Sequence, residues 1–306
     1  MVSARRPDRL AQRRARLAWL LVVPMLAAIA LVALWPLART VWFSVTDATL
    51  FDLKAAAYVG LGNYQLLILD PEWWRAAGNT LIFTAFSVTL EAGLGFAIAL
   101  TLHAHFPGRG ALRAAVLIPW AIPTVISAKM WGWMLHDVYG VVNAVLMNLG
   151  LIDQPVAWTA SPDLAMAALI AVDVWKTTPF VALLLLAGLQ MLPKEYYEAA
   201  RVDGASALMQ FLRITLPLMR PALAIAVIFR LLDAMRIFDL VYVLTGTNQQ
   251  TMTMAVYARQ QLIDFQDFGR GSAASTLLFL IIAMMTVIYV MAVRFRPSRP
   301  AAFAEP

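Results

Sequence analysis

The sequence contains no cysteine and few charged residues, which make up only 14% of its 306 positions. The absence of cysteine excludes disulfide bonds, cysteine-based metal sites and thiol nucleophiles. Soluble globular chains contain about 25% charged and about 45–50% apolar residues, whereas this chain is 61% hydrophobic. The composition therefore excludes an ordinary soluble protein and predicts a chain that lies largely within a membrane.

The sequence also lacks the residue patterns of an enzyme active site. No lysine directly follows a glycine, so the phosphate-binding pattern GxxxxGK[ST] is missing and the chain cannot hydrolyse ATP by that route. Its three histidines, His103, His105 and His136, do not form a metal triad, and no serine has aspartate and histidine partners near it in the sequence. We therefore expect no catalytic residue, metal or cofactor in this chain.

Six long apolar segments run through the sequence. A helix needs roughly 20 apolar residues to cross a bilayer, and the backbone in hydrocarbon must hydrogen-bond within its own segment. The predicted spans are residues 17–43, 79–102, 112–135, 164–190, 221–244 and 274–293. We predict an all-α membrane protein with six transmembrane helices. The membrane domain comprises residues 17–293, between an arginine-rich amino terminus (1–16) and a tail (294–306).

The basic residues are distributed unevenly between the segments that connect these spans. Lys and Arg favour the cytoplasmic side of a membrane protein. With the amino terminus inside, most of the 24 Lys and Arg residues fall in inner segments, and the outer segments receive only Arg39, Lys54, Arg75, Arg259 and Arg270. We predict that both termini are cytoplasmic. The net charge of +6 then reflects topology and does not indicate a nucleic-acid partner.

The longest inner segment, residues 191–220, reads MLPKEYYEAARVDGASALMQFLRITLPLMR. Pro193 favours the start of a short helix directly after it, and Gly204 ends that helix. Residues 205–214 can form a second short helix, which Leu216–Pro217 ends before the next span. The segment is therefore predicted to be a compact pair of helices that projects from the membrane.

A motif in this segment resembles a known family. Glu198-Ala199-Ala200 is followed by Gly204 six residues after the glutamate and by Ile214 and Leu216-Pro217. This pattern resembles the EAA motif of permease subunits in binding-protein-dependent ABC importers. The resemblance implies a type I ABC importer permease fold, in which residues 191–220 form a cytoplasmic coupling loop that docks on the ATP-hydrolysing subunit. The residues expected to dock are Glu198, Ala199, Ala200, Asp203, Gly204, Ala205, Ile214, Leu216 and Pro217.

Further stretches resemble the maltose/trehalose-type first permease of carbohydrate importers. They include VGLGNY at 59–64, NTLIFT at 79–84 and YVLTG at 242–246. Residues 174–180 (VWKTTPF) and 229–239 (FRLLDAMRIFD) are similar to trehalose-importer permeases. The chain departs from the family after Gly246, where Thr-Asn-Gln replaces further Gly and Pro.

This resemblance implies a set of partners and a location. The partners are a second homologous permease, two ATPase subunits that bind ATP and Mg, an extracytoplasmic sugar-binding protein and membrane lipid. The location is the cytoplasmic (inner) membrane of a bacterium or archaeon. The implied substrate is a disaccharide such as trehalose or maltose, and glycerol-phosphate or another oligosaccharide is the alternative. A stand-alone secondary transporter or channel would leave the EAA-like motif unexplained.

Several charged residues fall inside the predicted spans, where they are costly and indicate function. Neighbours three residues apart on a helix can pair, so these charges either line a path for sugar hydroxyls or hold helices together. We expect Arg230 and Asp233 to border the path, with Arg236 and Asp239 nearer its outer mouth. Glu91 and Lys129 are lone charges, for which pairing with each other or with a partner subunit stays open. The predicted path residues are Asp173, Lys176, Arg230, Asp233, Arg236 and Asp239.

Overall fold

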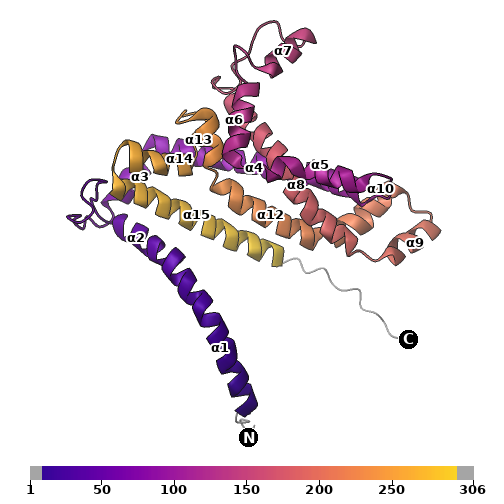
Figure 1. The fold of residues 1–306 in the computed structure, drawn as a ribbon, viewed down its shortest axis with the longest axis horizontal. Helices are drawn as coiled ribbons and strands as arrows, with labels where there is room; N and C mark the ends of the chain where they lie inside the picture. Colours follow the sequence, from indigo (N-terminus) through magenta and orange to yellow (C-terminus); the bar gives the residue numbers. More distant parts are fainter. Residues whose placement is uncertain (1–8, 295–306) are drawn as a thin grey trace.

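The computed structural model describes residues 9–294, and within them every named element is a helix (Figure 1). The predicted terminal segments 1–16 and 294–306 fall partly or almost wholly outside the described residues. Four helices are long and apolar enough to cross a membrane, and two bent helix pairs raise that number to six if each pair is one span. Four of the six predicted segments correspond to these four helices, and the third corresponds to the bent pair Arg109–Ala121 and Thr124–Met134. The fifth overlaps only the second helix of the other pair, Arg220–Met235, because the first helix, Ala207–Leu218, lies in the predicted inner segment 191–220. Two of the segments, the third and the fifth, are not single continuous helices.

Most of the first span stands apart from the other helices, and only its last part contacts the last span (Figure 1). It is one helical stretch that contains a five-residue π-helical turn, and its most apolar part buries no residue against the rest of the chain. Its apolar side chains are therefore available to lipid or to another subunit. The parts of this span are α1 (Arg9–Ile29), the π turn η1 (Ala30–Leu34) and α2 (Trp35–Phe43).

The centre of the fold is a pair of helices, α4 (Pro71–His103) and α8 (Ala165–Gln190), which lie side by side. Helix α4 begins well before the predicted residue 79, because the Asp70 side chain accepts a hydrogen bond from the Glu72 amide (2.8 Å) and Pro71 occupies the first turn. A side chain at Gly95 would come within 2.8 Å of Val181. The absence of a side chain there lets the two helices approach closely.

The third predicted span, residues 112–135, is not a straight helix. It consists of α5 (Arg109–Ala121) and α6 (Thr124–Met134), which meet at an angle of 91°. Proline has no amide hydrogen and biases the preceding residue toward extended backbone, and Ile122 before Pro123 has ψ 132°. Helix α6 therefore leaves the bundle sideways and leads to the short helix α7 (Val141–Asn148) at its far end (Figure 1).

The fifth predicted span, residues 221–244, is also interrupted. Helix α12 (Arg220–Met235) ends at Arg236, and a separate helix α13 (Asp239–Thr245) follows. No proline or glycine marks the break. The Thr253 hydroxyl donates a hydrogen bond to the carbonyl of Ile237 (3.0 Å), which satisfies a backbone group that the break exposes. Helix α13 packs beside α6, so the second halves of the two broken spans lie together.

The last span, α15 (Phe268–Arg294), runs along α12 and packs on α2. Its first residues are held to the start of α4 by a cluster of polar side chains. The Tyr257 hydroxyl donates to Asp70 (2.6 Å), and Arg270 forms an ion pair with the same carboxylate. Burial raises the pKa of Tyr257, so this hydroxyl keeps its proton at physiological pH. The short elements at this end of the bundle are α3 (Gly62–Leu69), α14 (Met254–Arg259) and the π turn η3 (Gln260–Asp264).

Candidate functional site

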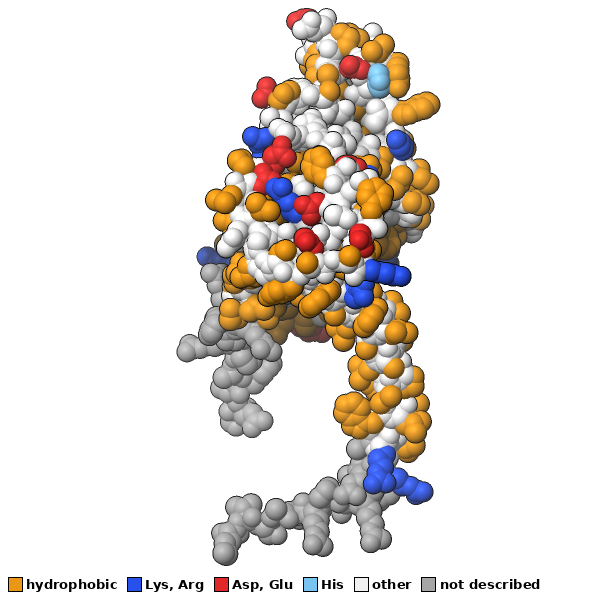
Figure 2. Space-filling view, turned by 90° about the vertical axis from the view of Figure 1, so that its left-hand side faces the viewer, with side chains coloured by type: hydrophobic (Ala, Val, Ile, Leu, Met, Phe, Trp, Pro, Cys, Tyr) orange, Lys and Arg blue, Asp and Glu red, His pale blue; other side chains and the backbone are white. Residues whose placement is uncertain are grey.

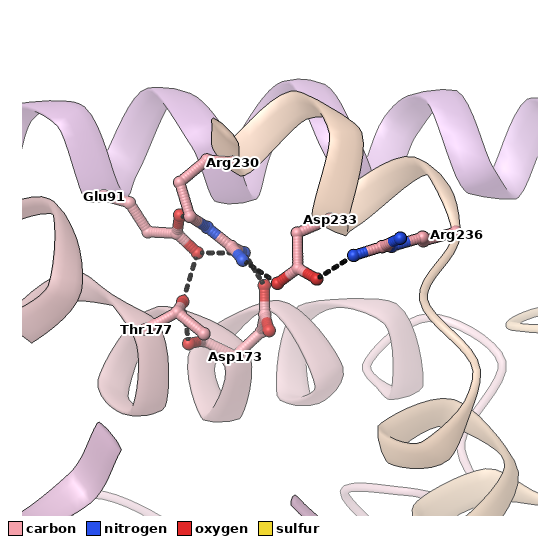
Figure 3. Close-up of polar contacts among 6 residues, drawn as sticks. All are labelled: Glu91, Asp173, Thr177, Arg230, Asp233 and Arg236. Carbon is pink, nitrogen blue, oxygen red and sulfur yellow. Dashed lines mark hydrogen bonds and ion pairs between the residues drawn. The ribbon is translucent and has the colours of Figure 1, made fainter. Parts of the chain in front are cut away.

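A buried arginine links three helices of the bundle (Figure 3). Arg230 on α12 has a side chain that is only 4% exposed and is bonded by Glu91 of α4 and Asp173 of α8. Its Nη2 lies 2.9 Å from Glu91 Oε1 and 3.0 Å from Asp173 Oδ2. The Thr177 hydroxyl donates to Glu91 Oε1 at 2.6 Å. Because a buried charge needs partners and hydrogen bonds, this cluster holds α4, α8 and α12 in one arrangement.

The cluster explains one of the two lone charges of the sequence, Glu91. Glu91 has a fully buried side chain and pairs with Arg230 in the same chain. Lys129 is exposed on α6 and forms no ion pair with any other residue in the described range 9–294. The interpretation that Glu91 pairs with Lys129 or with a partner subunit is therefore wrong. Hydropathy could not identify Arg230 as the partner, because the two residues are 139 positions apart.

Exposed charges continue from this buried cluster (Figure 3). Asp233 lies 2.6 Å from Arg230 Nη1 and 3.6 Å from Arg236 Nη2, and the side chains of Asp233 and Arg236 are 56% and 69% exposed. Asp239 belongs to the next helix, α13. The four charges at three-residue spacing therefore do not follow one continuous helix, because α12 ends between them.

Two adjoining cavities meet at these exposed charges. The first has a volume of about 220 Å³ and the second about 230 Å³, and Asp233 and Arg236 border both. Each of the six predicted path residues lines at least one of them. The first is lined by Trp120, Thr177, Phe180, Phe229, Arg230, Asp233 and Arg236. The second is lined by Thr124, Asp173, Lys176, Thr177, Asp233, Arg236, Ile237, Phe238 and Asp239.

Three aromatic side chains on one side of the first cavity were not among the predicted path residues. The rings of Trp120 and Phe180 are stacked with centroids 5.6 Å apart, and Phe229 meets Phe180 edge-on at 6.4 Å. They come from α5, α8 and α12, three helices that are distant in the sequence. Aromatic residues are common in apolar spans, so nothing in the sequence distinguishes these three. The cavity therefore combines an aromatic wall with charged hydrogen-bonding groups.

Lys176 connects the second cavity to the break in the third span. Its Nζ donates a hydrogen bond of 2.8 Å to the carbonyl of Ile122, just before Pro123. That carbonyl has no helical partner, because the chain leaves the helix at this position. Lys176 thus holds the bend between α5 and α6 against α8, in addition to lining the cavity.

The predicted coupling loop, residues 191–220, forms two helical segments, as expected, but the second is longer than expected. Helix α9 (Lys194–Val202) ends before Gly204, whose φ of +75° is a left-handed conformation that suits glycine. The second segment runs through α10 (Ala207–Gln210), the π turn η2 (Phe211–Thr215) and α11 (Leu216–Leu218). Leu216–Pro217 does not end it, because a proline fits the first turn of α11. A bend of 64° follows before α12.

The residues predicted to dock on an ATPase separate into two groups. The Tyr197 hydroxyl lies 2.9 Å from Thr215 Oγ1 and ties α9 to the second segment. Ala200 is buried, and Ala205, Ile214, Leu216 and Pro217 are partly buried. Glu198, Ala199, Asp203 and Gly204 are exposed, next to the exposed apolar side chains of Val202 and Leu208. The loop therefore presents a surface of small, acidic and apolar residues.

Comparison with protein families places most of the chain in one group. Residues 92–299 match the family described as the binding-protein-dependent transport system inner membrane component. This match includes Arg230, every residue that lines the two cavities, and the predicted coupling loop. Among residues 9–294, no group of three or more His, Asp or Glu side chains is arranged to hold a metal ion.

Several characterised relatives match along nearly their whole length. The chain is 42% identical over 295 residues to the trehalose/maltose transport system permease protein MalF of Thermococcus litoralis, covering 94% of this chain and 97% of that protein. It is 39% identical to the trehalose transport system permease protein SugA of Mycobacterium tuberculosis, covering 94% and 92%. It is 37% identical to the sulfoquinovosyl glycerol transport system permease protein SmoG of Agrobacterium fabrum, covering 91% and 90%.

A solved structure shares the fold. A chain of the bacterial alginate ABC transporter, in complex with an alginate pentasaccharide-bound periplasmic protein, aligns with a TM-score of 0.82 and 22% sequence identity. The alignment covers 94% of this chain and 98% of that chain. The similarity shows that this chain has the fold of an ABC importer permease.

Proposed function

Because the chain belongs to the binding-protein-dependent transport system inner membrane components, we propose that it is the sugar-conducting permease of an ATP-driven importer. It is a multi-pass inner-membrane protein that pairs with a second permease to enclose the path. Two separate ATPase subunits hydrolyse ATP, and an extracytoplasmic binding protein delivers the sugar. A trehalose- or maltose-like disaccharide is the substrate, in line with the relatives' names.

The observation that carries the substrate class is the pair of cavities. A sugar ring has C–H faces that pack on aromatic rings and hydroxyl groups that both donate and accept hydrogen bonds. Trp120 and Phe229 offer the aromatic surface, and Asp233 and Arg236 offer the exposed polar groups. A few well-placed polar groups on an otherwise apolar wall are typical of small-molecule sites. We assign the predicted path residues to the sugar's route, with Arg230 and Asp173 holding the wall in place.

We propose that the coupling loop, residues 191–220, docks on an ATPase subunit on the cytoplasmic side. Small residues such as Ala199 and Gly204 let a partner approach the backbone, and Glu198 offers a charge to an arginine or a helix end. Closure of the ATPases on ATP would move this loop together with the bend before α12, and so switch the cavities from inward- to outward-facing. The excess of basic residues on this side supports cytoplasmic termini.

The proposal is tested with the complete transporter in proteoliposomes. We expect ATP-dependent uptake of labelled trehalose, competed by unlabelled maltose and dependent on the binding protein. The control is the same complex with ATPase subunits that bind but do not hydrolyse ATP. Purification of the chain without any ATPase subunit would contradict the importer assignment. Uptake of sulfoquinovosyl glycerol in preference to both disaccharides would contradict the substrate class.

The exposed arginine of the cavities provides a specific prediction. Arg236→Gln is expected to raise the KM for sugar uptake about 10-fold, because a hydrogen bond from a charged group contributes about 1.5–3 kcal/mol. The thermal midpoint of the complex should not change, since the side chain is 69% exposed. Lys54→Gln, another exposed cation outside both cavities, is the matched control. An unchanged KM in Arg236→Gln would remove this residue from the sugar's route.

A further inference from the structure

The elbow between α4 and α5, residues 102–113, carries a cluster of basic side chains at the same end of the bundle as α9 (Figure 1). We propose that this cluster is a binding site for the phosphate group of an anionic phospholipid such as phosphatidylglycerol. The inference does not depend on the solute that the chain transports. It assigns a ligand to residues that line neither of the two cavities.

Several basic side chains gather around the ring of His103, the last residue of α4. Arg113 of α5 is fixed there, because its Nη2 donates a hydrogen bond of 2.9 Å to the carbonyl of Leu102 and so satisfies a group at the end of α4. Each of four neighbours is close enough for its charge to act on the ring, and they come from the connection, from α5 and from the start of α9. These neighbours are His105, Arg109, Arg113 and Lys194.

The elbow itself offers this cluster no acidic partner. The sequence has no Asp or Glu between Glu91 and Asp137, and within residues 9–294 none of Arg109, Arg113 and Lys194 forms an ion pair. Figure 2 shows the end of the molecule opposite to α9, where acidic and basic side chains lie next to one another. Like charges that are held together repel each other unless an opposite charge joins them. An anion is therefore the ligand that suits the elbow.

The position of the cluster indicates the source of this anion. Residues 104–108 connect α4 to α5, and so short a connection keeps its basic groups at the level where the two spans end on the proposed cytoplasmic side. Exposed apolar side chains adjoin them, such as Leu112 on α5, which is 38% exposed. Lipid phosphate groups occupy this level of a bilayer, and basic pockets between helices on the cytoplasmic side bind anionic headgroups. The elbow is therefore placed to meet a lipid headgroup.

The types of donor in the cluster suit a phosphate group. A guanidinium group binds phosphate oxygens through two parallel hydrogen bonds, and Arg109 supplies such a group. Lys194 supplies a flexible point charge from α9. A headgroup held by both residues joins the elbow to the first helix of the coupling loop. A free phosphate offers the same oxygens, but only a lipid also has acyl chains that cover the apolar surface beside the cluster.

The first test measures binding of phosphatidylglycerol to the purified transporter by native mass spectrometry. Arg109→Gln together with Lys194→Gln is expected to weaken the tightest binding about 10-fold, because each basic residue near a headgroup adds to its affinity. Arg113 is left unchanged, since it holds the end of α4. Arg213→Gln together with Arg220→Gln removes the same charge from exposed positions outside the cluster and is the matched control. Equal weakening in the two double variants would show only a general attraction of anionic lipid and would overturn the site.

A second measurement locates the lipid. Phosphatidylglycerol with a photoreactive group beside its headgroup is reconstituted with the complete transporter in nanodiscs, and labelled peptides are identified by mass spectrometry. The expected label lies within residues 104–115. Arg109→Gln together with Lys194→Gln should remove most of this label without changing the thermal midpoint in phosphatidylcholine. Label that survives in this variant would overturn the proposal, as would the absence of label because an ATPase subunit covers the cluster.

Inorganic phosphate distinguishes the lipid from a free phosphate. At millimolar concentration it is expected to leave the labelling of residues 104–115 unchanged. Labelling that inorganic phosphate abolishes would show that a free phosphate is the ligand and would overturn the lipid assignment. Phosphatidylcholine with the same photoreactive group has no net charge and is expected to label these residues about 10-fold less. Equal labelling by the two lipids would show that the basic cluster does not select an anionic headgroup.

Discussion

Arg230→Met is expected to lower the stability of the assembled permease by about 3–5 kcal/mol, the cost of removing one partner from a buried ion pair. The substitution leaves Glu91 and Asp173 facing each other with no cation, and both carboxylates are almost completely buried. The measurement is the thermal midpoint and the yield of the intact complex in detergent or nanodiscs. Arg236→Met, whose side chain is 69% exposed, should stay within about 0.5 kcal/mol of the parent.

A compensating variant distinguishes an unpaired charge from lost packing. Glu91→Gln and Asp173→Asn, added to Arg230→Met, replace the buried ions with neutral groups. Because neutral replacement of a whole buried ion cluster is often tolerated, the triple variant should recover a large part of the lost stability. If the triple variant is no more stable than Arg230→Met alone, the ion cluster does not hold α4, α8 and α12 together in the way proposed.

Gly204→Glu is expected to reduce sugar uptake more than 100-fold while the chain still folds and inserts. In the isolated chain a side chain at Gly204 meets no atom within 4 Å, so the variant has room for its glutamate. A docked ATPase would remove that room and place an unpaired charge in the interface, where such a charge costs several kcal/mol. The measurements are ATP-dependent uptake, ATPase activity stimulated by the binding protein and the amount of complex recovered.

A second glycine provides the control for backbone strain. Gly108 has φ +85°, also meets no atom within 4 Å and lies between the second and third spans. Gly108→Glu therefore imposes a similar left-handed strain of about 1–2 kcal/mol outside the coupling loop. We expect Gly108→Glu to keep most of the uptake. Equal losses in the two variants would show that strain is responsible, and wild-type uptake in Gly204→Glu would refute the docking proposal.

The sequence predicts the location of the spans better than their form. The fourth span was predicted at residues 164–190 and is helix α8, Ala165–Gln190. The third and fifth were each predicted as one transmembrane helix, yet each contains a break. Hydropathy averages over a window and is insensitive to a change of direction inside it. Pro123 marks the first break locally, whereas the second depends on the tertiary hydrogen bond from Thr253 to Ile237.

In the candidate site, too, the local sequence predicts some features, whereas contacts between residues far apart in the sequence determine the others. Charge inside an apolar segment identified all six of the charged residues that line the two cavities. The roles of these charged residues could not be predicted from their position in the sequence, because the i,i+3 spacing favoured pairing along one helix. The structure instead joins Arg230 to Glu91 and Asp173 on two other helices. The aromatic wall of Trp120, Phe180 and Phe229 likewise forms only when three helices meet.

The buried ion cluster of Arg230, Glu91 and Asp173 affects how the chain is inserted into the membrane during synthesis. Glu91 enters the membrane 139 residues before Arg230, so its carboxylate has no intramolecular cation while the intervening chain is synthesised. The separate first span is more hydrophobic than α4 or α8 and can settle in lipid alone. For α4 and α8 we expect insertion to remain incomplete, with both helices retained beside the insertion machinery, until α12 brings the guanidinium group. Biosynthesis of this permease would then proceed in two stages, with its central helices released together.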